Sequence, residues 1–215
     1  MVKSFVMVIS GLLCSLLMFF PSLDMACSRL LYNNDLISNQ IIKLIFNSIP
    51  IAIAINFIGC GVLFVYNKYK IDKTIIYIVI AGLLGPGLIV NTCLKDHMGR
   101  ARPREIIEFS GIKKFTKVFA FSNECGTNCS FPSGHAAFAY YLTAWSIVFN
   151  KRKNTVFLLF IIFGTIVGLG RIIQGGHFLS DVVASCFIVL LVNWLLFKLL
   201  NPLSFDSERY KSPDF

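Results

Sequence analysis

Long apolar runs alternate with short polar connections along most of this chain. An α-helix needs about 20 residues to cross the roughly 30 Å hydrocarbon core of a bilayer. Six runs approach that length with few charges, and they span residues 5–21, 48–66, 74–94, 133–149, 155–173 and 178–199. The pattern predicts an all-α polytopic membrane protein, with six transmembrane helices packed in a bundle.

The first apolar run admits two interpretations. Lys3 followed by an apolar core is typical of a signal peptide, which is cleaved after small residues. No such cleavage site follows cleanly, and Pro21 and Asp24 suit the end of a helix. We therefore expect a membrane anchor that is retained.

The third run contains an unusual group of helix-disrupting residues. Gly82, Gly85, Pro86 and Gly87 lie within six positions of one another. Proline removes a backbone donor, and glycine allows a neighbouring helix to approach closely. We expect this run to be kinked or to pack tightly against a neighbour.

The polar connections predict which end of the bundle faces the cytosol. Residues 67–73 and 150–154 are short and rich in lysine or arginine, a pattern typical of the cytosolic side. Both termini would then be cytosolic, and the outer side would hold the connections 22–47, 95–131 and 174–177. Because the long outer connection is itself basic, this topology requires a separate explanation for its charge.

Composition agrees with a single membrane domain over residues 1–215. The chain is 56% hydrophobic and 14% charged, whereas a soluble domain carries about a quarter charged residues. The net charge of +9 comes from clusters between the apolar runs, without the aromatic and basic face of a nucleic-acid-binding protein. The basic clusters therefore indicate cytosolic anchoring and an anionic ligand, at different connections, and exclude nucleic acid as a partner.

Two of the seven cysteines, Cys125 and Cys129, share the long outer connection. A zinc site would need more ligands than this connection offers. A local disulfide is favoured if the connection is extracytosolic, where disulfides persist. Four others lie in apolar runs and are most simply small hydrophobic residues.

The chain has only three histidines, His97, His135 and His177, and each lies in a short polar motif. Histidine is the side chain best suited to proton and phosphoryl transfer near neutral pH. Each motif lies near arginine or lysine, and all three fall on the predicted outer side. One site at that face would explain the basic charge found there.

In the third motif, Arg171 precedes His177, and Asp181 follows four residues after the histidine. An arginine at the end of an apolar helix needs a partner or a polar cavity, so an Arg171–Asp181 structural pair is one interpretation. On a helix, however, His177 and Asp181 would share a face and could hydrogen-bond. Such a carboxylate makes the other ring nitrogen more nucleophilic. Gly175 and Gly176 would leave room for a ligand, and the motif favours a functional site.

The second motif is Pro132-Ser133-Gly134-His135. Proline and serine suit the start of a helix, where free backbone N–H groups bind anions. Gly134 would permit a phosphate to approach closely. An ordinary helix cap with an exposed histidine is the alternative.

The first motif places Lys95, Arg100, Arg102 and Arg104 at the outer end of the third run. An arginine fork binds phosphate oxygens bidentately, and lysine adds a point charge. The alternative is a juxtamembrane basic patch that contacts anionic headgroups.

Taken together, the three motifs resemble the signature of the type 2 phosphatidic acid phosphatase family, which includes lipid phosphate phosphatases. That signature reads Lys-x6-Arg-Pro, then Pro-Ser-Gly-His, then Ser-Arg-x5-His-x3-Asp. The motifs lie between residues 95 and 181, and the resemblance covers about residues 82–190. One position departs from the family, because Gly170 stands where serine is usual. This departure puts one hydrogen bond to the phosphate in doubt.

The resemblance implies a role for each matching residue. His177 would be the nucleophile that forms a phosphohistidine, Asp181 would orient it, and His135 would be the general acid. The phosphoryl oxygens would be bound by Lys95, Arg102, Ser133, Gly134 and Arg171. The family needs no metal or cofactor, and the few acidic residues here form no cluster suited to Mg²⁺ or Zn²⁺. His97 matches no catalytic position.

Residues 95–105, KDHMGRARPRE, resemble the bacterial lipid A phosphatase branch of the family. This implies removal of the 1- or 4′-phosphate of lipid A at the periplasmic face of a bacterial inner membrane, with the bilayer and its phosphorylated lipid as partners. Undecaprenyl pyrophosphate phosphatase and phosphatidylglycerophosphate phosphatase are the alternatives within the family. Outside hydrolysis, the alternatives are a lipid phosphotransferase and a non-catalytic transporter, although a transporter would not need these motifs at these spacings.

Overall fold

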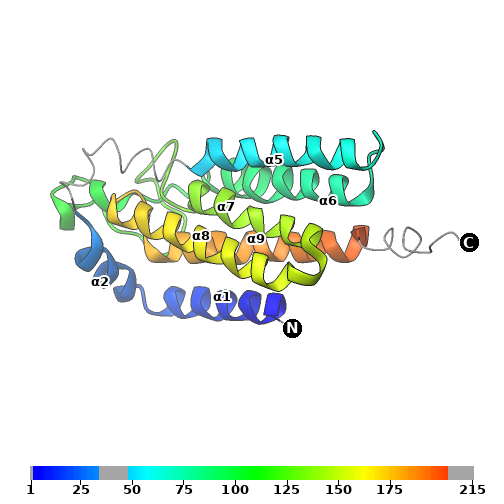
Figure 1. Cartoon of the computed structure of the whole chain (residues 1–215). Coiled ribbons are helices and arrows are strands. Elements are labelled where there is room, and N and C mark those ends of the chain that lie inside the picture. Colours follow the sequence, from blue (N-terminus) through cyan, green and yellow to red (C-terminus); the bar gives the residue numbers. More distant parts are fainter. Residues whose placement is uncertain (1, 34–47, 203–215) are drawn as a thin grey trace, which may run out of the picture.

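The computed structural model describes residues 2–33 and 48–202, which fold into a bundle of helices (Figure 1). The N-terminal part holds α1 (Val2–Phe19) and α2 (Ser22–Leu31). The middle part holds α5 (Ser48–Tyr66), α6 (Lys73–Gly82) and the π-helical segment η1 (Leu83–Leu94). The C-terminal part holds α7 (Gly134–Tyr141), the 3₁₀ segment η4 (Leu142–Arg152), α8 (Lys153–Ile173) and α9 (Leu179–Leu200). The all-α prediction is confirmed for the described residues.

Helix α7 lies at the centre of the bundle and contacts α5, η1, α8 and α9. Helices α5 and α6 cover one side of it, while α1 packs against α9 on the other (Figure 1). One end of the bundle carries the start of α1, the end of α9 and the two short basic connections. The opposite end carries α2, the long connection after η1 and the turn between α8 and α9 (Figure 1).

Within the described residues, four helical segments are long and apolar enough to cross a membrane: α1, α6 with η1, α8 and α9. The central segment formed by α7 and η4 is mostly buried inside the protein and is more polar. Thr143 there accepts a hydrogen bond from Asn193 at 3.1 Å, and Ser146 accepts one from Lys3 at 2.8 Å. A helix shielded from lipid by its neighbours tolerates such polar groups because they pair across helices.

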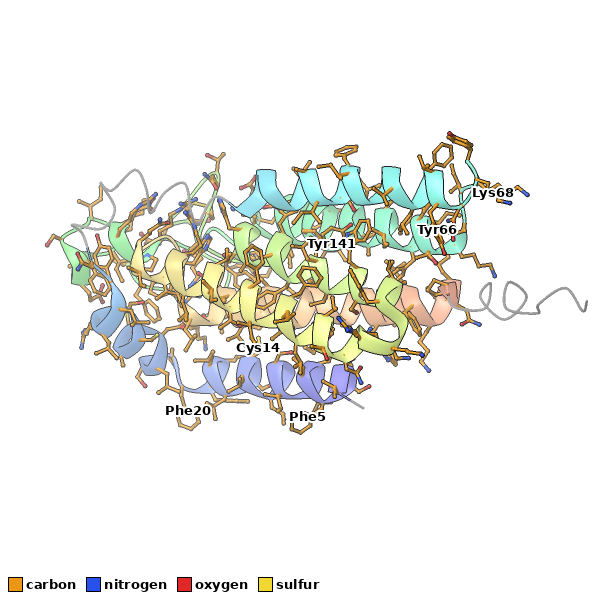
Figure 2. The ribbon with its side chains drawn as sticks, in the orientation of Figure 1. Phe5, Cys14, Phe20, Tyr66, Lys68 and Tyr141 are labelled. Atoms are coloured by element: carbon orange, nitrogen blue, oxygen red, sulfur yellow. A yellow bond between two sulfur atoms is a disulfide. The ribbon has the colours of Figure 1, made fainter. Side chains whose placement is uncertain are left out.

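Side chains on the outside of the bundle are large and apolar. Phe5 and Phe20 are 65% and 56% exposed and point away from the neighbouring helices, whereas Cys14 and Tyr141 lie inside (Figure 2). An apolar exterior around a partly polar interior is the arrangement that lipid solvation favours. The described chain therefore has the surface of a multi-pass membrane protein.

The glycine and proline group in the third run changes the type of helix. Helix α6 ends at Gly82, and the wider π-helical η1 begins directly after it. Within η1, the Asn91 side chain donates to the Pro86 carbonyl at 2.7 Å. A Cβ on Gly82 would stand 2.9 Å from the ring of Tyr141, so this position also permits the close packing of α7.

One part of the predicted outer connection 22–47 is helical, since α2 covers Ser22–Leu31. Apolar spacing alone did not predict this short helix, because its buried side is polar and includes Asp24 and Ser28. Residues 34–47 lie outside the described residues.

The connection from residue 95 to residue 133, predicted to be outer, folds into a compact layer over the end of the helices opposite the two short basic connections (Figure 1). We call it the outer layer. Phe131, Val118 and Met98 pack together against Ala184 of α9, and Ile106 packs with Phe178. Cys125 and Cys129 are joined by a disulfide in this layer. The connection is thus a fixed part of the fold, able to hold side chains in defined positions.

We predict that Gly164→Ala in α8 lowers the free energy of unfolding by about 1–3 kcal/mol, the usual effect of overpacking. A Cβ at this position would overlap the ring of Tyr140 on the central helix. The matched control is Gly61→Ala in α5, where a Cβ meets nothing within 4 Å and helix propensity should add about 0.5–1 kcal/mol of stability. Thermal unfolding in detergent measures both. Equal midpoints for the two variants would contradict the tight packing of α7 on α8.

Candidate active site

The three histidine-bearing motifs supply side chains to one site at the end of the bundle that the outer layer covers. His135, in the first turn of α7, interacts electrostatically with His177, Arg171, Lys95 and Arg102. These residues come from α7, the α8–α9 turn, the end of α8, the end of η1 and the long connection. The fold therefore gathers basic groups that are far apart in the sequence.

His177 is not on the helix that carries Asp181, and in this respect the expectation from spacing was wrong. Helix α9 begins at Leu179, and His177 lies in the preceding turn. Its Nδ1 is 3.8 Å from Asp181 Oδ2, beyond hydrogen-bond distance, but 2.6 Å from the carbonyl oxygen of Ser130. A carbonyl can only accept, so Nδ1 carries the proton and Nε2 the lone pair.

The ring of His177 is 1% exposed, and its Nε2 makes no hydrogen bond to any described residue. Burial lowers the pKa of His177 to about 4; the positive charge of Arg171 acts in the same direction, while the Asp181 carboxylate opposes it. The imidazole is therefore neutral at physiological pH. A neutral ring with a bare Nε2 has the form required of a nucleophile.

Asp181 is fully buried and is held by three donors. Arg100 Nη1 donates to Oδ1 at 2.5 Å, while Ser130 Oγ and the Phe178 backbone N–H donate to Oδ2 at 2.6 and 2.8 Å. The structural pair between Arg171 and Asp181 that the sequence suggested does not form, because Arg100 takes that position. The carboxylate also caps the first turn of α9, which fixes the helix relative to the His177 turn.

Arg171 lies at the end of α8 and donates through Nη1 to the side-chain oxygen of Gln174 at 2.6 Å. Its Nε is buried without a hydrogen bond to any described residue. The two glycines expected to make room for a ligand also have conformational and packing roles. Gly175 has φ +59° and packs against Tyr32, and a Cβ on Gly176 would stand 3.2 Å from Nη2 of Arg171. Glycine thus allows the tight turn and the position of the arginine.

Arg102 is held by the disulfide loop. Its Nε and Nη2 donate to the Asn128 carbonyl at 3.2 and 2.6 Å, and Asn128 lies between the two bonded cysteines. The backbone N–H of Asn128 in turn donates to Asp96 at 2.7 Å. Both guanidinium contacts are to a neutral oxygen, so the positive charge of Arg102 is retained.

Lys95 follows η1 directly and is 9% exposed. Its Nζ lies 3.3 Å from the place where a Cβ on Gly134 would stand, and Asn91 Oδ1 lies closer still. Gly134 is required here because a side chain would displace both groups. Burial, assisted by the positive charges of Arg102 and Arg171, lowers the pKa of Lys95 to about 8.

Ser133 is buried and caps α7, its side-chain oxygen accepting from the Ala136 N–H at 3.5 Å. The expected helix start is therefore present at this motif, with His135 in the first turn. His97 is exposed. Gly170 is buried in α8, one residue before Arg171.

Sequence reasoning missed three residues that hold the site together: Ser130, Asn128 and Gln174. Their contributions are a hydroxyl, backbone carbonyls and an amide, and none of them belongs to a charged or glycine-bearing motif. Arg100 stood in the basic cluster, but nothing in the sequence separated it from its neighbours. Only the tertiary contacts identify these residues.

The arrangement can bind an oxyanion. Lys95, Arg102 and Arg171 carry positive charge, two of them are held by neutral acceptors, and the first turn of α7 adds backbone N–H groups. Within residues 2–33 and 48–202, no group of three or more histidine, cysteine or acidic side chains could hold a metal ion.

We predict that the double variant Cys125→Ser, Cys129→Ser binds orthovanadate more weakly than the wild type. Opening the loop frees the Asn128 carbonyl, and Arg102 loses its fixed position. A loss of about 1–2 kcal/mol corresponds to roughly 5- to 30-fold in affinity. The upward shift of the unfolding midpoint with vanadate concentration measures it. Cys93→Ser, an exposed free cysteine, is the control and should behave as wild type. Unchanged vanadate affinity in the double variant would contradict a role for the loop in holding Arg102.

The chain is similar in sequence to several bacterial proteins. The chain is 39% identical over 144 residues to the lipid A 4′-phosphatase of Francisella tularensis subsp. novicida (strain U112), covering 65% of this chain and 64% of the relative. It is 35% identical over 111 residues to the lipid A 4′-phosphatase of Rhizobium leguminosarum, covering 51% and 48%. It is 26% identical over 147 residues to phosphatidylglycerophosphatase B of Bacillus subtilis (strain 168), covering 65% and 62%.

These matches span about half to two thirds of each relative, and no solved structure matches the chain. The family model of the PAP2 superfamily matches residues 73–204. That range includes η1, the outer layer, α7, α8 and α9, and with them every basic group of the site. The chain therefore belongs to the PAP2 superfamily.

Proposed function

We propose that the protein hydrolyses a phosphomonoester of a membrane lipid through a phosphohistidine intermediate, and that its substrate is lipid A, cleaved at the 4′-phosphate. The observation that carries the mechanism is the state of His177. Its ring is neutral, and its Nδ1–H is held by a carbonyl. Its Nε2 makes no hydrogen bond to the described part of the chain and lies within electrostatic range of Lys95 and Arg171. The relatives named lipid A 4′-phosphatase support the substrate and position.

In the first step, the lone pair on His177 Nε2 attacks phosphorus. An N–P bond forms while the bond between phosphorus and the ester oxygen breaks. His135, in its protonated form, donates a proton to the departing ester oxygen. The ring of His177 then carries both a proton on Nδ1 and the phosphoryl group on Nε2. The Ser130 carbonyl and the nearby Asp181 carboxylate stabilise the positive charge that develops on this ring.

In the second step, His135 is neutral and accepts a proton from a water molecule as the water attacks phosphorus. The N–P bond breaks, inorganic phosphate leaves, and His177 regains its lone pair. Lys95, Arg102 and Arg171 oppose the charge that spreads over the phosphoryl oxygens in both transition states. Ser133 and the Gly134 N–H complete this set at the start of α7.

An apolar cavity of about 430 Å³ supports a lipid substrate. Phe138 and Tyr141 of α7 line it, together with Gly87 of η1, and the same two helical segments carry His135 and lead to Lys95. An acyl chain lying there would have its phosphate-bearing headgroup at the outer end of the bundle. Phe138 follows His135 by about one helical turn on α7, so one end of the cavity lies near the site.

For the orientation, we propose that a bacterial inner membrane is crossed six times, with the site at the periplasmic face. The six crossing segments would be α1, α5, α6 with η1, α7 with η4, α8 and α9. The short basic connections lie at one end of the bundle and the site at the other (Figure 1), which agrees with cytosolic placement of the basic connections. The disulfide lies at the site end and also suits an extracytosolic compartment.

Phosphatidylglycerophosphate is the second candidate substrate, because one relative is named phosphatidylglycerophosphatase B. It is a phosphomonoester with a smaller headgroup than lipid A. The same histidines and cations would act on it, so only a substrate assay separates the two.

We expect purified protein in detergent to remove one phosphate from lipid A, as measured by mass spectrometry of the product and its fragments. His177→Ala should abolish the reaction while leaving the protein folded, and His97→Ala, at an exposed position, should retain it. Release from phosphatidylglycerophosphate but not from lipid A would select the second candidate. No release from any phosphorylated lipid would disprove a phosphatase.

We further expect kcat/KM to fall as the pH rises through about 8, the pKa of Lys95. Above this pH the free enzyme loses the ammonium charge and binds the phosphate dianion less well. Lys95→Met should have low activity without this alkaline fall, and Lys95→Arg should shift the fall to higher pH. An unchanged alkaline fall in Lys95→Met would assign the titration to another group.

A further inference from the structure

Arg100 lies in the outer layer, yet its side chain is only 1% exposed. Its Nε donates to the Thr116 carbonyl at 2.9 Å, its Nη2 donates to Asp24 at 2.8 Å, and its Nη1 donates to Asp181 at 2.5 Å. The guanidinium carbon also lies 4.3 Å from the centre of the Phe178 ring. Every nitrogen of this guanidinium is therefore engaged inside the protein.

The partners of Arg100 distinguish it from the two arginines of the site, Arg102 and Arg171. Arg102 and Arg171 donate to a backbone carbonyl and an amide oxygen, so their charges remain available to an anion. Arg100 lies between the carboxylates of Asp24 and Asp181, both fully buried. Its charge is neutralised within the protein, and a phosphate would gain little from it. Arg100 is thus suited to hold other groups in place.

Arg100, Asp181 and Ser130 form a closed ring of hydrogen bonds. The Ser130 N–H donates to the Arg100 carbonyl at 2.8 Å, and Ser130 Oγ donates to Asp181 at 2.6 Å. The Arg100 guanidinium completes the ring at Asp181. Ser130 is therefore fixed through both its backbone and its side chain, and its carbonyl is held toward Nδ1 of His177 at 2.6 Å.

We propose that Arg100 is a positioning residue for the nucleophile. Acting through Asp181 and Ser130, it holds His177 in the tautomer that has a proton on Nδ1 and a lone pair on Nε2. The kinetic consequence rests on the proposed function, whereas the tautomer itself can be measured in the protein without substrate. Asp181 then acts on His177 mainly through Ser130 and less by direct contact.

Asp24 extends this arrangement to the N-terminal part of the chain. It accepts from the Ser180 backbone N–H at 2.8 Å and hydrogen-bonds with the Ser180 hydroxyl, so α2 is joined to the first turn of α9. It also supplies the second negative charge beside Arg100. Through this contact, a short helix of no obvious function braces the turn that carries His177.

Nitrogen-15 NMR of the full-length protein in detergent, labelled at histidine, tests the tautomer. Only three histidines contribute, and His177→Asn identifies the signals of interest. We expect the wild type to show a protonated Nδ1 and an unprotonated Nε2 at His177. In Arg100→Met the ring should populate both tautomers. Lys117→Met, at an exposed lysine of the same layer, should give the wild-type spectrum.

Kinetics provide the second measurement. Arg100→Met should lower kcat by up to about 10⁴-fold, the effect of losing the group that fixes the tautomer of a catalytic histidine, while KM changes by less than about threefold, since phosphate binding is intact. Arg100→Lys keeps the positive charge but lacks the planar guanidinium that donates to several acceptors at once. Its tautomer populations and its kcat should therefore fall between those of Arg100→Met and the wild type.

Arg100→Met leaves two carboxylates unpaired and could fail to fold for that reason. In that case the double variant Arg100→Met, Asp24→Asn removes one of the buried charges. Arg100→Lys, which keeps the positive charge, serves as the second comparison. Folded Arg100 variants with the wild-type tautomer and kcat would overturn the proposal. If the wild type releases no phosphate from any lipid, the proposed function fails, but the NMR comparison still decides the role of Arg100.

Discussion

Repulsion between positive charges is the constraint on which the site end of this protein depends. Lys95, Arg102 and Arg171 lie close together at the edge of a low-dielectric bundle, where like charges repel more strongly than in water. Carboxylate partners would relieve the repulsion but would also cancel the charge that an oxyanion needs. The structure instead fixes Arg102 with the Asn128 carbonyl and Arg171 with the Gln174 amide, and both arginines keep their charge.

The buried carboxylates are kept for a different purpose. Asp24 and Asp181 both pair with Arg100, which brings α2, the outer layer and α9 together beneath the site. Arg100 is thus neutralised by carboxylates, whereas Arg102 and Arg171 keep their positive charge. The site can therefore be rigid while two of its arginines remain available to bind an anion. Rigidity matters for the proposed phosphoryl transfer because in such reactions a protein contributes mainly positioning and electrostatic stabilisation.

The helices supply the frame for this layer. The central helix α7 is surrounded by its neighbours, so it can neither slide nor rotate relative to them. Ser133 and His135, at its start, are therefore held in fixed positions. The disulfide between Cys125 and Cys129 closes a loop within the layer. The apolar contacts of Phe131 and Phe178 hold the layer against the bundle. The connection that holds the charged groups in place is thus stabilised by a disulfide and by apolar packing, as a small folded domain is.

The sequence by itself determined the class of fold, the approximate helices and the residues that form the basic site, because hydropathy, glycine and proline placement and motif spacing are local properties of the chain. It did not determine that His177 precedes α9, that Arg100 replaces Arg171 as the partner of Asp181, or that Ser130, Asn128 and Gln174 hold the site. Helix α2 was missed as well, since its buried side is polar. These features depend on which carbonyls, amides and carboxylates meet across segments far apart in the chain, and only the tertiary structure decides that.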